Sequence, residues 1–190
     1  MKKCFFLFFI LLISKTFSEI IEIKNISEIS EYLLKADLVV FDLDNTIMEN
    51  SQQLGSDQWF DYQINLNQKN GLNYQAALSK TLLQWYEIQA ITKVNLVEKE
   101  VKRIIDLLQN KKIHLMGLTA RNYDLAFSTI KQLDSLNIDF QKTSLSKKNI
   151  INDEIYYRNG ILFANGINKG QVLKNFFSKI KFDPRSIVFC

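Results

Sequence analysis

Residues 38–46 read Leu38-Val39-Val40-Phe41-Asp42-Leu43-Asp44-Asn45-Thr46. Four consecutive apolar residues are typical of a strand that is buried on both faces of a parallel sheet. Two aspartates follow this run, two positions apart, where the strand is expected to end. In open α/β sheets, ligands bind beyond the carboxyl ends of the strands. The stretch therefore predicts an α/β fold with an acidic site at one rim of its sheet.

Helix and strand patterns alternate on both sides of this stretch. Asn159-Gly160 lies between two β-prone runs and predicts a β-hairpin before the last helix. The other expected elements are helices over 27–36, 96–109 and 123–136, strands over 113–118 and 138–140, a helix that opens at 168–170, and a buried strand over 186–190. Such alternation favours a Rossmann-like parallel sheet.

Residues 48–95 interrupt the alternation after the first strand. The segment is rich in polar and aromatic residues, and its clearest pattern is a helix over 74–89. We expect a mostly helical insertion that covers the mouth of the sheet. Trp59 and Trp85 fit two interpretations, the lining of a substrate pocket or, as is commoner for aromatic residues at helical spacing, hydrophobic core.

The first 18 residues have the layout of a secretory signal peptide. Lys2 and Lys3 precede an apolar run over 4–13 and a polar stretch over 14–18, which predicts cleavage near Ser18–Glu19. The apolar run is about half of the ~20 residues that span a bilayer, so no stable membrane span is expected after cleavage. We predict an exported protein, periplasmic or secreted, whose domain occupies residues 19–190.

Composition narrows the possible partners. The chain of 190 residues carries a formal charge of +4, and loss of the three lysines in residues 1–18 lowers this charge to +1. Such a small charge does not indicate nucleic-acid binding. Cys190 is then the single cysteine, so no intrachain disulfide is expected.

Two residues at the ends of other elements complete a set of groups suited to phosphoryl transfer. Thr119 ends the strand over 113–118, and Lys169 stands at the start of a later helix. One carboxylate can attack phosphorus while a second carboxyl protonates the leaving alcohol. A hydroxyl and an ammonium can hold the phosphoryl oxygens, and Mg²⁺ prefers oxygen ligands. The set predicts a small phosphorylated substrate.

In these motifs and their order, the chain resembles the haloacid dehalogenase superfamily. Residues 41–47 match its first motif, Asp-x-Asp-x-Thr after an apolar strand, residues 115–119 match the second motif, and Lys169 matches the third. The predicted signal peptide and insertion make the chain most similar to the secreted acid-phosphatase branch and to a related uncharacterised bacterial family. The resemblance implies a Rossmann-like fold of the haloacid dehalogenase type.

The resemblance also implies a role for each motif residue. Asp42 would be the nucleophile and Asp44 the general acid and base. The Asp42 carboxylate and the Asp44 backbone carbonyl would bind Mg²⁺, while Thr119 and Lys169 would hold phosphate. Arg121 would either clamp the substrate or form a surface ion pair. His114, inside a strand pattern, is expected to be a packed structural residue and not a base.

The fourth motif of the superfamily consists of acidic residues after a strand of the kind expected over 186–190, and the sequence does not contain it. We expect either a fragment or a protein with weakened metal affinity. The preferred function is an exported Mg²⁺-dependent phosphomonoesterase that acts through an aspartyl-phosphate intermediate. The alternatives are a catalytically impaired binding or interaction protein with the same fold, and a phosphotransferase, which shares every motif.

Overall fold

The computed structural model describes residues 19–190, so the predicted signal peptide lies outside the described residues. In chain order, the helices and strands are η1 (Ile26–Ile29), α1 (Ser30–Lys35), β1 (Leu38–Asp42), β2 (Met48–Asn50), α2 (Asp57–Lys69), α3 (Tyr74–Ile91), β3 (Val94–Leu96), α4 (Lys99–Asn110), β4 (His114–Thr119), η2 (Tyr123–Leu125), α5 (Ala126–Ser135), η3 (Phe140–Thr143), β5 (Ile150–Ile151), β6 (Tyr156–Arg158), β7 (Ile161–Phe163), α6 (Lys169–Ile180) and β8 (Ile187–Phe189).

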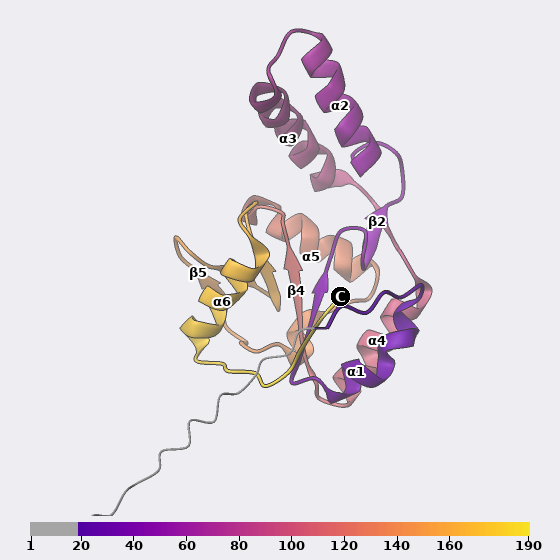
Figure 1. Cartoon of the computed structure of the whole chain (residues 1–190), viewed down its shortest axis with the longest axis vertical. Coiled ribbons are helices and arrows are strands. Elements are labelled where there is room, and N and C mark those ends of the chain that lie inside the picture. Colours follow the sequence, from indigo (N-terminus) through magenta and orange to yellow (C-terminus); the bar gives the residue numbers. More distant parts are fainter. Residues whose placement is uncertain (1–18) are drawn as a thin grey trace, which may run out of the picture.

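A six-stranded sheet with the order β5-β6-β7-β4-β1-β8 forms the centre of the molecule (Figure 1). β8, β1, β4 and β7 run parallel, and β6 and β5 add an antiparallel edge. β1 and β4 are paired along their whole length, so Asp42 lies opposite Leu118, next to Thr119. The expected Rossmann-like α/β class is confirmed, together with the helical insertion after the first strand and the hairpin before the lysine helix.

Helices cover both faces of the sheet because the apolar run of β1 alternates between them. Val39 and Phe41 point into the core formed with α1, α4 and α5. Leu38 and Val40 point into the second core, which α6 closes with Val172 and Phe176. The four apolar residues of β1 are fully buried. The apolar run is continuous, without alternating polar residues, because both faces of the strand lie in a core.

The predicted hairpin joins β6 to β7 through two residues with positive φ, Asn159 (50°) and Gly160 (78°). A Cβ atom on Gly160 would lie 2.6 Å from the backbone carbon of Phe140, so both φ and space require glycine there. The hairpin places β7 beside β4 and thereby extends the parallel part of the sheet.

The strand expected over 138–140 is wrong. Ile138 and Phe140 are buried, but Asp139 between them accepts a hydrogen bond from the backbone N–H of Gln141 and starts the 3-10 helix η3. β7 pairs with β4 at the position where such a strand would lie. A short apolar run therefore packs against the sheet without joining it.

Two expectations about burial are also wrong. β8 is a strand, but Ile187 and Phe189 are 42% and 52% exposed because β8 stands at one end of the strand order. His114 is exposed at the start of β4, where its Nδ1 lies 3.1 Å from the carbonyl oxygen of Thr143. The histidine is thus neither packed in the core nor close to the carboxyl end of its strand.

The insertion consists of the two-stranded antiparallel sheet β2–β3 and a helical hairpin, α2 and α3, that projects away from the main sheet (Figure 1). The sequence patterns predicted α3 and missed α2, β2 and β3. A buried hydrogen bond from Asn67 to Thr81 joins the two helices. Within residues 19–190, no helix is both long enough and apolar enough to cross a bilayer.

Candidate active site

The structure brings the five predicted site residues together at one rim of the sheet. Asp42 ends β1, Thr119 ends β4, and Lys169 is the first residue of α6. The Nζ of Lys169 lies 2.6 Å from Oδ2 of Asp42, and Oγ1 of Thr119 lies 3.3 Å from Oδ2 of Asp44. Residues up to 127 positions apart in sequence therefore meet because parallel strands share one carboxyl end.

The Asp42 carboxylate is held by one neighbouring backbone group and one ammonium. Its Oδ1 accepts a hydrogen bond of 2.8 Å from the backbone N–H of Leu43, and its Oδ2 pairs with Lys169. The side chains of the pair are 29% and 28% exposed. Asp42 is thus fixed in position while both charged groups stay accessible to a ligand.

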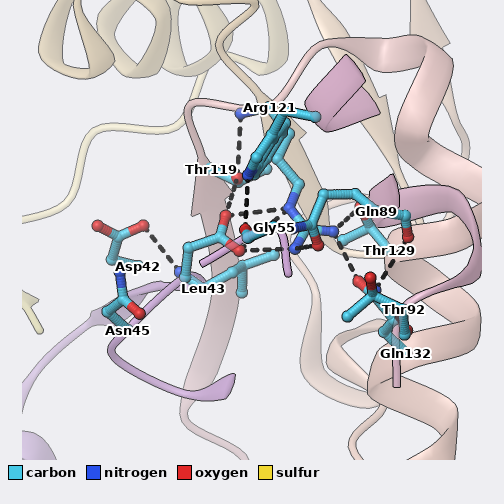
Figure 2. Close-up of polar contacts among 12 residues, drawn as sticks. Asp42, Leu43, Asn45, Gly55, Gln89, Thr92, Thr119, Arg121, Thr129 and Gln132 are labelled. Carbon is cyan, nitrogen blue, oxygen red and sulfur yellow. Dashed lines mark hydrogen bonds and ion pairs between the residues drawn. The ribbon is translucent and has the colours of Figure 1, made fainter. Parts of the chain in front are cut away.

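The Asp44 carboxylate has a different partner, the guanidinium of Arg121 (Figure 2). Nη2 of Arg121 lies 2.6 Å from Oδ1, and Nε lies 3.0 Å from Oδ2. The Arg121 side chain is 1% exposed and that of Asp44 is 34% exposed, so the guanidinium is buried while the carboxylate stays accessible to a ligand. Two parallel charge-assisted hydrogen bonds of this kind fix the orientation of a carboxylate.

All five N–H donors of Arg121 have acceptors inside the protein. Nε and one hydrogen of Nη2 serve Asp44, and the other Nη2 hydrogen is within 3.3 Å of Oε1 of Gln89. Nη1 donates to Oγ1 of Thr129 at 3.1 Å and to Oε1 of Gln132 at 2.6 Å. A buried guanidinium is tolerated only when it is paired and hydrogen-bonded, which this arrangement achieves.

The same network connects the insertion to the core. Gln132 on α5 donates through Nε2 to the carbonyl oxygens of Gln89 and Thr92, at the end of α3. Gln89 and Trp85 both donate to the carbonyl oxygen of Gly55, at 2.9 Å each. The position of Asp44 therefore depends on groups from α3, α5 and the loop before α2.

The sequence interpretation missed Gln89, Thr129 and Gln132. All three are buried polar residues on helices. On α5, Thr129 and Gln132 are buried together with the apolar residues Ala126 and Leu133. Polar residues on an apolar helix face, together with an arginine after a strand end, were the available signal. Each of these polar residues has many possible partners, so the sequence did not predict that they would bind Arg121.

Two other expectations concern Thr119 and Trp85. Thr119 is fully buried, and its hydroxyl accepts from the backbone N–H of Arg121 and donates to Asp44. Phosphate binding by Thr119 and Arg121 stays a prediction. Trp85 is half-buried and lines a cavity, so the expectation that it belongs to the core is wrong. Burial raises the pKa of the Cys190 thiol to about 12.

The donor atoms at this rim are of the type that Mg²⁺ prefers. Asp42 offers a hard carboxylate oxygen, and Asp44 follows two positions later. Within the described residues, no three side chains of the His, Cys, Asp or Glu type gather closely enough to hold a metal by themselves. Mg²⁺ sites commonly combine one or two carboxylates with oxygens of the substrate phosphate, and the residues present fit that pattern.

The comparisons with known proteins relate residues 22–190 to one family, whose description is "Protein of unknown function (DUF2608)". A Chlamydia trachomatis protein named "Putative outer membrane protein" is 27% identical over all of this chain and 74% of its own length. A Chlamydia pneumoniae protein of the same name is 26% identical over 88% of this chain, which spans 65% of that relative. A solved structure named "putative beta-phosphoglucomutase", from Thermotoga maritima, is 14% identical, with a TM-score of 0.45 over 80% of this chain and 74% of its own.

Proposed function

We propose that this chain, which belongs to the DUF2608 family, is an exported Mg²⁺-dependent phosphomonoesterase that works through an aspartyl-phosphate intermediate. The observation that carries the proposal is the contact of 2.6 Å between Lys169 and Asp42, with Asp44 and Thr119 at the same rim. A nucleophilic carboxylate beside an ammonium and a second carboxylate is the minimum that phosphate-ester hydrolysis by this route needs.

In the first half of the reaction, an oxygen of Asp42 attacks phosphorus and the bond from phosphorus to the ester oxygen breaks. The leaving alkoxide takes its proton from Asp44, which must enter the step in its protonated form. In the second half, Asp44 removes a proton from water, and the water oxygen attacks phosphorus. The bond from phosphorus to Asp42 then breaks, which releases phosphate and restores both carboxyl groups.

The residues around Asp42 also have defined roles in this reaction. Lys169 exchanges its contact with Asp42 for a contact with the phosphoryl oxygens, which its exposure permits. The backbone N–H of Leu43 keeps the nucleophile oriented. Asp42 and the backbone carbonyl of Asp44 would hold Mg²⁺, which would offset the negative charge of the phosphoryl group.

The deciding experiment is hydrolysis of p-nitrophenyl phosphate by the purified protein in the presence of Mg²⁺. We expect turnover that depends on Mg²⁺ and falls at least about a thousandfold in Asp42→Asn, because the nucleophile is removed while its shape is kept. Glu31→Gln, an exposed change on α1, is the matched control and should keep full activity. Equal rates in wild type and Asp42→Asn would refute the proposal.

A second function is favoured by the way Asp44 is held. Both oxygens of Asp44 accept hydrogen bonds from Arg121, and this contact competes with any contact between Asp44 and a leaving group. A protein with this arrangement could bind phosphate esters at Asp42 and Lys169 without hydrolysing them. Binding of a phosphate ester with no turnover at any Mg²⁺ concentration would favour this scaffold over the enzyme. Transfer of phosphate to an added alcohol would instead reveal a phosphotransferase.

The proposed location rests on two observations. Residues 1–18 have the composition of a signal peptide, and the chlamydial relatives carry the name of an outer membrane protein. We expect the full chain, expressed in a bacterium, to be found outside the cytoplasm with Glu19 as its first residue. Fractionation followed by N-terminal sequencing measures both, and an unprocessed chain in the cytoplasm would contradict export.

A further inference from the structure

A cavity of about 390 Å³ opens beside Asp44, between the end of β1 and the insertion. Its walls come from the turn after Asp44, from the loop that leads to α2, and from Trp85 and Gln89 on α3. If Asp44 protonates the leaving group, this cavity is where the leaving group lies. The following inference thus rests on the proposed phosphate position at Asp42 and Lys169.

The charge of the cavity wall has one sign. Three carboxylates line it, those of Asp44, Glu49 and Asp57, and no lysine or arginine is among its lining residues. Arg121 offsets the charge of Asp44, so Glu49 and Asp57 carry the uncompensated negative charge of the wall. The nearest guanidinium, that of Arg121, has used all five of its donors within the protein. Nothing in the wall can therefore pair with a second anionic group on a substrate.

The remaining polar lining is rich in carboxamides. Asn45 and Gln89 are engaged with Asp57 and with the Gly55 carbonyl oxygen. Within the described residues, the side chains of Asn50, Gln52 and Gln53 make no hydrogen bond to the protein, although they line the cavity. A carboxamide both donates and accepts, which matches hydroxyl groups and leaves charged groups uncompensated.

We propose that the cavity selects phosphate monoesters whose alcohol is neutral and polyhydroxylated, such as a sugar, and discriminates against esters that carry a second anionic group. The free carboxamides bind the hydroxyls, and Trp85 supplies an aromatic wall for the carbon skeleton. A second anion in so small a space comes within several ångströms of the wall carboxylates. Repulsion at such distances corresponds to roughly a tenfold loss of affinity.

Binding of two matched probes tests this preference without any need for turnover. Glucose 6-phosphate and 6-phosphogluconate share a six-carbon skeleton and a terminal phosphate, but only the second carries a carboxylate. Calorimetric titration of the full chain with Asp42→Asn, which blocks hydrolysis, should give a Kd about tenfold lower for glucose 6-phosphate. Equal affinity, tighter binding of 6-phosphogluconate, or binding of neither probe would overturn the inference.

Reversal of one charge in the cavity wall tests whether the wall carboxylates cause the preference for a neutral alcohol. Glu49 is exposed on β2 and lines the cavity, so Glu49→Lys should bring the two Kd values within about threefold of each other. Glu31→Lys on α1 makes the same charge change outside the cavity and should leave the ratio unchanged. An unchanged ratio in Glu49→Lys, or an equal shift in both variants, would contradict the assignment to this cavity.

Hydrolysis of p-nitrophenyl phosphate by the wild-type protein separates this inference from the proposed function. A protein that prefers glucose 6-phosphate in binding but hydrolyses nothing would support the cavity assignment and refute the phosphatase. A protein that hydrolyses the aryl phosphate but binds both probes equally would support the phosphatase and refute the cavity assignment.

Discussion

On the Asp42 side of the site, a lysine at the start of α6, whose side chain is 28% exposed, makes the ion pair. On the Asp44 side, a buried arginine makes the ion pair and is itself held by residues of α3 and α5 (Figure 2). The two aspartates belong to one short motif and are separated by a single residue. Adjacent parts of one motif thus have different roles, ligand exchange on one side and rigid assembly on the other.

The physical basis of this difference is solvent access. An accessible ion pair contributes little to stability, since water and salt compensate each charge when the pair separates. A buried guanidinium such as that of Arg121 cannot leave its partner without remaining as an unpaired charge in the interior, so this separation is costly. Lys169 can therefore leave Asp42 for a phosphate. Arg121 cannot leave Asp44 without disturbing its contacts with α3 and α5.

The largest expected effect is that of Arg121→Ala. The change leaves Asp44 with a single side-chain donor, from Thr119, and removes the common partner of Thr129 and Gln132. Loss of this buried side chain leaves a cavity and buried acceptors without their donor, which together lower the free energy of unfolding by about 3–5 kcal/mol. Urea unfolding followed by circular dichroism measures it. A loss below about 1 kcal/mol would show that the Asp44 side is no more rigid than the Asp42 side.

An intermediate effect is expected for Gln132→Ala. The substitution removes the acceptor of one Nη1 hydrogen of Arg121 and the donor that binds the carbonyl oxygens of Gln89 and Thr92. Unsatisfied buried groups lower the free energy of unfolding by about 1–3 kcal/mol each. Ser135→Ala on the same helix, where the hydroxyl bonds only within its own turn, is the matched control. Equal losses in the two variants would mean that the link to α3 adds no stability.

A small effect on stability is expected for Lys169→Ala. Its pair with Asp42 is nearly one-third exposed, so the free energy of unfolding should fall by less than about 1 kcal/mol. The Kd for a phosphate ester should nevertheless rise by about tenfold, because the phosphoryl oxygens lose their ammonium. Unfolding and calorimetric titration of one preparation give both values. Strong destabilisation with unchanged binding would reverse the comparison between the two sides.

The smallest expected effect is the coupling between the two sides. The double variant Lys169→Ala with Gln132→Ala should lose the sum of the two single losses within about 0.5 kcal/mol, because the residues share no partner. Arg121→Ala with Gln132→Ala should be clearly non-additive, because these residues touch. Strong coupling in the first cycle would show that the two sides act as one unit.

Several elements could be predicted because they depend on short stretches of sequence. The apolar run before Asp42 specified a doubly buried strand, and Asn159-Gly160 specified a hairpin because both residues readily adopt positive φ. The helix expected over 96–109 is α4, in which Val101, Ile104 and Leu108 recur at helical spacing and are buried. The meeting of Asp42, Thr119 and Lys169 at one rim followed from parallel strands, since all their carboxyl ends lie on the same side.

The pairing of the buried polar groups depends on the tertiary structure. Arg121 and Asp44 are 77 positions apart, and Gln132 reaches Gln89 across 43 positions. No local pattern selects such pairs, because many side chains can satisfy a guanidinium and the choice depends on which helices pack side by side. The same reason underlies the exposed β8 and the 3-10 helix at Phe140, whose apolar sequences do not specify their neighbours. Short-range patterning fixes where the strands end, and long-range packing fixes which charge stays free to bind a ligand.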